Sequence, residues 1–191
     1  LDNGYFSVPA DIGSTIFKWS AAGGARVHSA SWGAANEGAY GADEESVDRF
    51  AWANREFLAV FAAGNAGPAS GTVVSPAMAK NVLAVGATMN NIESVQLARG
   101  SAVREAADTY SADWIADFSS RGSAKFAFAK PDIVAPGGAF VWSAAFDAPK
   151  SGSCNSTNDV ILGLEGTSMA TPVVAGSAVL VGQALSTLLE Q

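Results

Sequence analysis

The chain has 191 residues, with 11 basic and 18 acidic side chains, one His and one Cys. Hydrophobic residues make up 49% of it and charged residues only 15%, a composition that excludes intrinsic disorder and supports one buried core. The net charge of −7 and the lack of a basic run argue against a nucleic-acid partner, because phosphate neutralisation needs clustered Lys and Arg. One Cys excludes a disulfide framework or a Cys-rich zinc site within the chain. His-based acid–base chemistry would need His28 or a His from elsewhere.

The N-terminal part predicts two helices and a strand. Apolar residues at helical spacing favour a helix over 9–22, which a Gly pair would end. The segment 27–31 is typical of a short strand. A second helix is expected over 46–57, with Ser46 as its N-cap.

Further strands follow, with Gly-rich loops at their ends. Continuous apolar runs at 58–63 and 81–87 are typical of strands buried on both faces of a parallel sheet. Shorter strands are expected at 115–118, 132–135 and 140–144. Strands alternating with helices indicate an α/β fold, whose chemistry lies at the carboxyl ends of the strands.

A long uncharged helix is expected after Ser168. The segment 166–189 has the length of a membrane span. However, Gly, Ser, Thr and Gln residues and one Pro dilute its hydrophobicity, and no Lys or Arg flanks it. We therefore expect a buried core helix and no membrane partner, with a transmembrane helix as the alternative.

Ser168 lies where the small-residue loop Gly166-Thr-Ser-Met-Ala-Thr-Pro172 enters this helix. A Ser here has free backbone N–H donors nearby and lies at the positive end of the helix dipole, which together stabilise a developing oxyanion. The alternative is a simple N-cap without chemistry. An α/β-hydrolase nucleophile elbow is excluded, because that fold needs an acid and a His after the Ser and no His follows Ser168.

Two more segments lie at predicted strand ends. Asn65, in Ala62-Ala-Gly-Asn-Ala-Gly67, presents a side-chain amide where an α/β site should lie, although Asn also tolerates a left-handed turn without any function. The other segment is Ser29-Ala-Ser-Trp-Gly33. Its Gly33 lets another backbone approach closely, and Trp32 is either a packing residue or a ligand contact.

Together these segments resemble the subtilisin-like serine proteases, the subtilases. GTSMATP is similar to the family's nucleophile motif, FAAGNAGP to the segment with the oxyanion Asn, and ASWG to the strand that lines the substrate cleft. ADFSSRG and KPDIVAPGG match two further family segments, and the order along the chain is the same. The resemblance runs from about Ala25 to the C-terminus and looks closest to the oxidatively stable alkaline proteases of bacilli and their relatives.

This resemblance implies a three-layer fold, with a mostly parallel sheet between helices, that is incomplete on its N-terminal side. Residues 1–191 would form a single, truncated catalytic domain. Ser168 would attack the scissile carbonyl of a polypeptide substrate, while the Asn65 amide and the Ser168 N–H would stabilise the tetrahedral oxyanion. The substrate-binding residues implied by the resemblance are Ser31, Trp32, Gly33, Ala62, Ala63 and Gly64. The small side chains of the last three indicate a roomy pocket for large apolar groups.

The family's catalytic Asp and His precede the matched segments, and neither motif is found in 1–26. His28 falls on a predicted strand, so we expect it to be structural, with a catalytic role as the alternative. The base is then expected in a missing N-terminal part of the same domain, and the 191-residue chain alone should be inactive. The missing strand would also leave an apolar strand edge exposed beside 27–31. A non-catalytic scaffold that acts as a binding or structural module is the other interpretation.

The resemblance also implies an extracellular location. We expect no cofactor and no metal in this chain, and calcium only in the full-length family member. Asp43, Glu44 and Glu45 form an acidic cluster, which a solvated helix N-terminus explains without a metal. Asn155-Ser-Thr157 is a glycosylation sequon, which we expect in an exposed polar loop.

Overall fold

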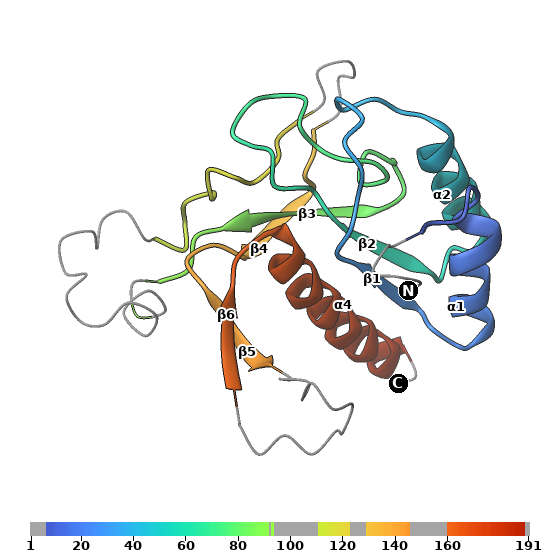
Figure 1. Cartoon of the computed structure of the whole chain (residues 1–191). Coiled ribbons are helices and arrows are strands. Elements are labelled where there is room, and N and C mark those ends of the chain that lie inside the picture. The colour runs from blue at the N-terminus through green and yellow to red at the C-terminus, as the bar shows by residue number, and fades with distance from the viewer. Residues whose placement is uncertain (1–6, 92, 94–110, 123–128, 146–159, 190–191) are drawn as a thin grey trace, which may run out of the picture.

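A computed structural model describes residues 7–91, 93, 111–122, 129–145 and 160–189 (Figure 1). Cys154 and the Asn155 sequon lie outside these residues. The centre is a parallel sheet in the order β1-β2-β3-β4, and a separate antiparallel pair is formed by β5 and β6. The strands are β1 Val27–Ala30, β2 Leu58–Ala62, β3 Leu83–Thr88, β4 Ile133–Pro136, β5 Val141–Ala145 and β6 Val160–Leu164. The helices are a π-helical turn Gly13–Phe17, α1 Lys18–Ala22, α2 Ala42–Ala53 and α4 Thr167–Leu189.

The helices cover both faces of the parallel sheet, which confirms the three-layer α/β fold. Successive residues of a strand point to opposite faces, so the apolar run of β2 is buried on both sides. Phe61 packs in the cluster formed with α1 and α2, while its neighbour Val60 packs with Ala170 and Val174 of α4. Figure 1 shows α4 running across one face of the sheet, with α1 and α2 on the other side.

The second helix differs from its prediction, since α2 spans residues 42–53 rather than 46–57. Glu44 Oε2 accepts a hydrogen bond from Gly41 N at 2.8 Å, so the acidic cluster starts the helix. Ser46 therefore lies inside α2, where its Oγ accepts from Gly13 N at 2.9 Å. The cluster is not wholly solvated, because Glu44 is only 1% exposed.

Other helix and strand boundaries also differ from those predicted. The helix expected over 9–22 begins at Gly13, and its first turn is capped by Asp11 Oδ1, which accepts from Ser14 N at 3.0 Å. The strand expected at 115–118 is wrong: a single bridge joins Ile115 to β3, and the chain then turns. The pairing of β6 with β5 was not predicted.

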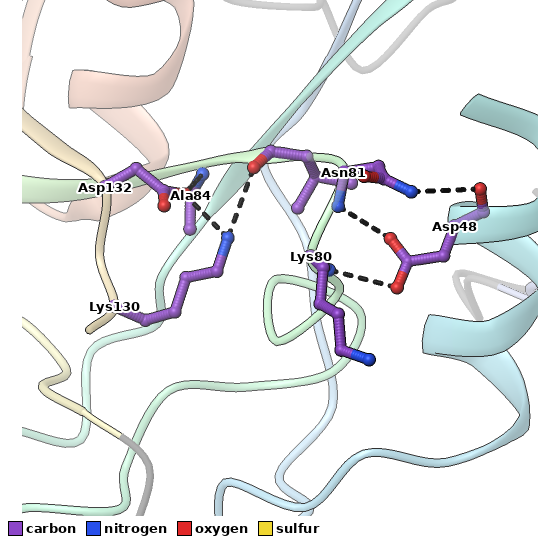
Figure 2. A network of polar contacts seen from close by, with 7 residues as sticks. Asp48, Lys80, Asn81, Ala84, Lys130 and Asp132 are labelled. Atoms are coloured by element: carbon purple, nitrogen blue, oxygen red, sulfur yellow. Dashed lines mark hydrogen bonds and ion pairs between the residues drawn. The ribbon is translucent and has the colours of Figure 1, made fainter. Parts of the chain in front are cut away.

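Polar contacts around the buried side chain of Lys130 fix where β3 and β4 begin (Figure 2). The Lys130 side chain is only 2% exposed, and its Nζ donates to the Val82 carbonyl at 3.2 Å and pairs with Asp132 at 2.7 Å. Asp132 Oδ2 also accepts from Ala84 N at 2.7 Å. These bonds join the entry of β3 to the entry of β4. In the same view, Asp48 of α2 accepts from the backbone N–H groups of Lys80 and Asn81.

Only the first half of α4 is a core helix. Its buried residues are Thr167, Ala170, Thr171, Val174 and Ala175. The large apolar residues of its second half are exposed, namely Val179, Leu180, Val181, Leu185, Leu188 and Leu189. The expected core helix is thus only half right, because the described part of the chain supplies no cover for this end. Within that part, α4 alone is long and apolar enough to span a membrane by length and composition. β1 is an edge strand, paired only with β2 among the described residues, as expected.

Candidate active site

Ser168 lies in the first turn of α4, at the carboxyl end of the parallel sheet. The helix begins one residue earlier, so the Ser168 backbone N–H has no carbonyl four residues back inside the helix. The preceding Gly166 has φ +148, and a Cβ there would lie 3.3 Å from Asn65 Nδ2. Position 166 in the loop before the nucleophile is thus glycine for two reasons, its backbone conformation and the proximity of this amide.

Ser168 and Ser31 exchange two hydrogen bonds across 137 positions of sequence. Ser168 Oγ donates to the Ser31 carbonyl at 3.3 Å, and Ser31 Oγ donates to the Ser168 carbonyl at 2.8 Å. The end of β1 and the start of α4 are therefore joined at the nucleophile itself.

The amide of Asn65 is oriented by Thr167. Asn65 Oδ1 accepts from both Thr167 N and Thr167 Oγ1, each at 2.9 Å. Thr167 Oγ1 in turn accepts from Gly64 N at 3.2 Å, and Thr167 is fully buried. Because the oxygen of the carboxamide is occupied in this way, its Nδ2 is left as the donor beside Gly166 and Ser168. Thr167 lies within the nucleophile motif, but no local pattern in the sequence predicts its role.

A cavity of about 250 Å³ lies beside these groups. It is lined by Ser31, Trp32, Gly33, Ala62, Gly64, Asn65, Val74, Thr167 and Ser168. The predicted substrate-binding residues line it, with one correction: Ala63 does not. Ala63 is fully buried in the core on the α1 and α2 side, and its N–H donates to the Val85 carbonyl. The alternation of the strand directs Ala62 toward the cavity and its neighbour away from it.

Val74 forms part of the cavity wall and was not predicted. A Cβ on Gly33 would lie 2.4 Å from one Val74 methyl group, and a Cβ on Gly64 would lie 2.7 Å from the other. The two glycines therefore make room for Val74 rather than for a ligand. This fills part of the roomy pocket that the small residues of the 62–64 segment indicated, and nothing in the local sequence around Val74 marked it.

A second, apolar cavity of about 540 Å³ lies on the other side of the nucleophile, between α4 and the β5–β6 pair. Its lining residues are Val141, Trp142, Ser143, Ala144, Leu164, Ser168, Met169, Pro172 and Val173. Ser168 thus lines both cavities, one formed mainly by small and polar residues and the other mainly by apolar residues.

His28 does not belong to this site. Its Nδ1 lies 3.2 Å from Ser20 Oγ, and its ring makes an edge contact with Phe17 at a centroid distance of 5.1 Å. Burial lowers the pKa of His28 below the ordinary 6.5. These contacts are with the α1 layer, whereas Ser168 lies at the start of the helix on the opposite face of the sheet. In the described part of the chain, no three His, Cys, Asp or Glu side chains come together as metal ligands.

Comparison with known proteins gives consistent results. The profile described as "Subtilase family" matches residues 7–190. "Serine protease AprX" of Bacillus subtilis (strain 168) is 35% identical over 129 residues, which cover 64% of this chain and 25% of that protein. Among solved structures, "Sphericase" superposes with a TM-score of 0.54 at 28% identity over 90% of this chain and 49% of that one. "S41 Psychrophilic Protease" gives a TM-score of 0.54 at 29% identity, over 93% of this chain and 50% of that one. The chain thus spans about half the length of these structures and a quarter of AprX.

Proposed function

This chain belongs to the subtilase family, whose profile covers nearly all of it, and we propose that it is the nucleophile-bearing part of a serine endopeptidase. The observation that carries the proposal is the position of Ser168. Its hydroxyl lies at the N-terminus of α4, next to an Asn65 amide whose oxygen is already bound by Thr167. A nucleophile and oriented oxyanion donors in one place are the requirements of acyl transfer.

In the proposed reaction, Ser168 Oγ attacks the carbonyl carbon of a peptide bond and forms an acyl-enzyme, which water then hydrolyses. The negative charge that develops on the carbonyl oxygen is stabilised by the Ser168 N–H and Asn65 Nδ2. In subtilisin, a relative, loss of the oxyanion-hole Asn lowers kcat by about 10²–10³, and we take that magnitude from the relative. Substrate backbone would pair in an extended form along Ser31–Gly33, as an added strand.

The base of this reaction would come from outside these 191 residues. His28 is the single His of the sequence, and its partners are Ser20 and Phe17 rather than Ser168. We propose that a segment with the catalytic Asp and His, from the rest of the same domain, packs on the free edge of β1 and the exposed face of α4. It would fill the apolar cavity beside Ser168, and its His would reach Ser168 Oγ there. On this proposal the 191 residues are one truncated domain and are inactive alone.

The same proposal extends to substrate and location. The substrates would be polypeptides, as the names of its protease relatives favour, and the enzyme would act outside the cell, as the resemblance implies. Calcium would be held by the full-length enzyme rather than by this chain. A scaffold without activity remains the competing function, and it predicts the same fold without turnover.

The test compares the 191-residue chain with the longest natural chain that contains it together with an Asp segment and a His segment. The longer chain should hydrolyse a fluorogenic peptide and become labelled on Ser168 by a fluorophosphonate, and Ser168→Ala should abolish both. The 191-residue chain should do neither. Turnover by the short chain that disappears in Ser168→Ala would overturn the proposed source of the base, and a folded but inactive long chain would favour the scaffold.

A further inference from the structure

The backbone on both sides of Asn65 is held by one buried residue, Ser120. Its backbone N–H donates to the Gly64 carbonyl at 3.0 Å, and its Oγ accepts from Ala66 N at 3.1 Å. Ser120 is fully buried although Asn65 itself is exposed. One residue thus binds the peptide groups immediately before and immediately after the residue that carries the amide.

The fit between these two segments is close. Gly64 has φ +106, and a Cβ there would lie 2.9 Å from Ser120 Oγ. Gly67 donates its N–H to the Phe118 carbonyl at 2.8 Å, and a Cβ on Gly67 would lie 2.1 Å from the Ser119 carbonyl oxygen. The loop is therefore pressed backbone to backbone against 117–120, with glycines wherever a side chain would separate them.

We propose that Ser120 is a positioning residue, which fixes the backbone of Asn65 so that its amide already points at the oxyanion. This inference rests on the proposed function of Asn65. Thr167 orients the carboxamide from α4, and Ser120 anchors the main chain from the 117–120 segment. Both anchors are needed because an oxyanion hole lowers the barrier only if its donors are in place before the charge develops.

Ser119 provides a matched control. It is also fully buried, and its Oγ also accepts one backbone N–H, that of Ala87 in β3, at 3.0 Å. Ser119→Ala and Ser120→Ala therefore remove the same atom, and each leaves one backbone N–H without its side-chain acceptor, that of the buried Ala87 or that of the more exposed Ala66. Only Ser120→Ala affects the loop that carries Asn65.

The experiment is carried out in the complete protease, with Ser120→Ala, Ser119→Ala, Asn65→Ala and the double variant Asn65→Ala/Ser120→Ala. Both Ser variants should lower the melting temperature, Ser119→Ala at least as much as Ser120→Ala, because the N–H that it leaves unpaired is the more deeply buried. We expect Ser120→Ala to lower kcat about 10-fold with little change in KM, since a small misplacement of a catalytic group costs up to about 10²-fold. Ser119→Ala should stay within about 2-fold of wild type, and in the Asn65→Ala background the Ser120 substitution should have no further effect on kcat.

The outcomes separate the two hypotheses. An unchanged kcat in Asn65→Ala would contradict the proposed role of Asn65. Two results would overturn the role of Ser120 alone, provided that Asn65→Ala lowers kcat. One is a kcat of Ser120→Ala equal to that of Ser119→Ala. The other is a double variant in which the losses of kcat from Asn65→Ala and Ser120→Ala multiply. If Ser120→Ala does not fold, Ser120→Cys keeps a weak acceptor of similar size. That variant should then show a partial loss of kcat and faster hydrogen exchange at the Ala66 N–H, and wild-type values for both would overturn the proposal.

Discussion

Ser31 and Pro172 are linked through one oxygen atom, the carbonyl oxygen of Ser168. In a regular helix this oxygen would accept the N–H of residue 172, but Pro has no N–H to donate. Ser31 Oγ donates to it instead, at 2.8 Å. The Pro within α4 thus frees the carbonyl of the nucleophile for a contact with the end of β1, which fixes Ser168 relative to the sheet.

Removal of the Ser31 hydroxyl should therefore matter only while Pro172 is present. Ser31→Ala leaves the Ser168 carbonyl without its partner and should lower the free energy of unfolding by about 0.5–1.5 kcal/mol, together with a fall in kcat. In Pro172→Ala, the restored N–H can bond the same carbonyl, so Ser31→Ala should then cost much less. Urea unfolding and peptide turnover of the complete protease measure both. An equal cost in the two backgrounds would show that the link through Ser168 is not real.

The Thr167 hydroxyl should act through the orientation of the Asn65 amide. Thr167→Val keeps the shape of the side chain but loses the donor to Asn65 Oδ1 and the acceptor for Gly64 N. We expect kcat to fall about 10-fold with KM nearly unchanged, because the contact matters in the transition state. Thr167→Ser, which keeps the hydroxyl, is the control and should retain most of the activity. Equal losses in the two variants would point to packing rather than to orientation.

Val74 should limit the size of the side chain that the smaller cavity accepts. Val74→Ala removes methyl groups that lie between Gly33 and Gly64, so the preference for Phe over Ala before the cleaved bond should rise about 10-fold in kcat/KM. Val73→Ala is the matched control, since Val73 is fully buried in the core and does not line the cavity. That variant should lose stability with no change in the preference. A similar shift in both variants would attribute the effect to general loosening.

His28 should make stability, but not catalysis, depend on pH. Burial lowers the pKa of His28 in the folded chain below 6.5, so the unfolded chain binds more protons. The contribution is therefore fully present above the unfolded pKa and is lost as the pH falls from about 6.5 toward the folded value. His28→Leu should remove this part of the pH dependence of unfolding and leave the kcat profile of the complete protease unchanged. A kcat that collapses in a folded His28→Leu would restore the catalytic alternative.

The sequence allowed the fold class and most strands to be predicted, because the strands of a buried parallel sheet are continuous apolar runs. Ser168 and Asn65 could be proposed as site residues for a related reason, because their motifs are local and lie at strand or helix ends. The start of α2 was misplaced, because Ser46 looks like an N-cap locally but bonds Gly13, 33 residues away. Local patterns do not record such contacts.

The supporting residues of the site were missed for the same reason. Thr167 and Ser120 bind the Asn65 loop from 102 and 54 positions away in the sequence. Val74 lines the cavity from a loop in which no motif marks it. Ala63 was assigned to the cavity because it is small and adjacent, whereas the alternation of β2 turns it into the core. The narrower resemblance to the oxidatively stable branch remains a prediction.

The exposed apolar half of α4 would make these 191 residues prone to associate with other chains when the partner segment is absent. The face of α4 on which the partner segment would pack is the same face that would attract chaperones and degrading proteases while it is bare. A chain that carries the nucleophile without its partner segment would thus be recognised as unfinished and cleared. Proteolytic activity would then be found only in molecules whose partner segment is present and folded.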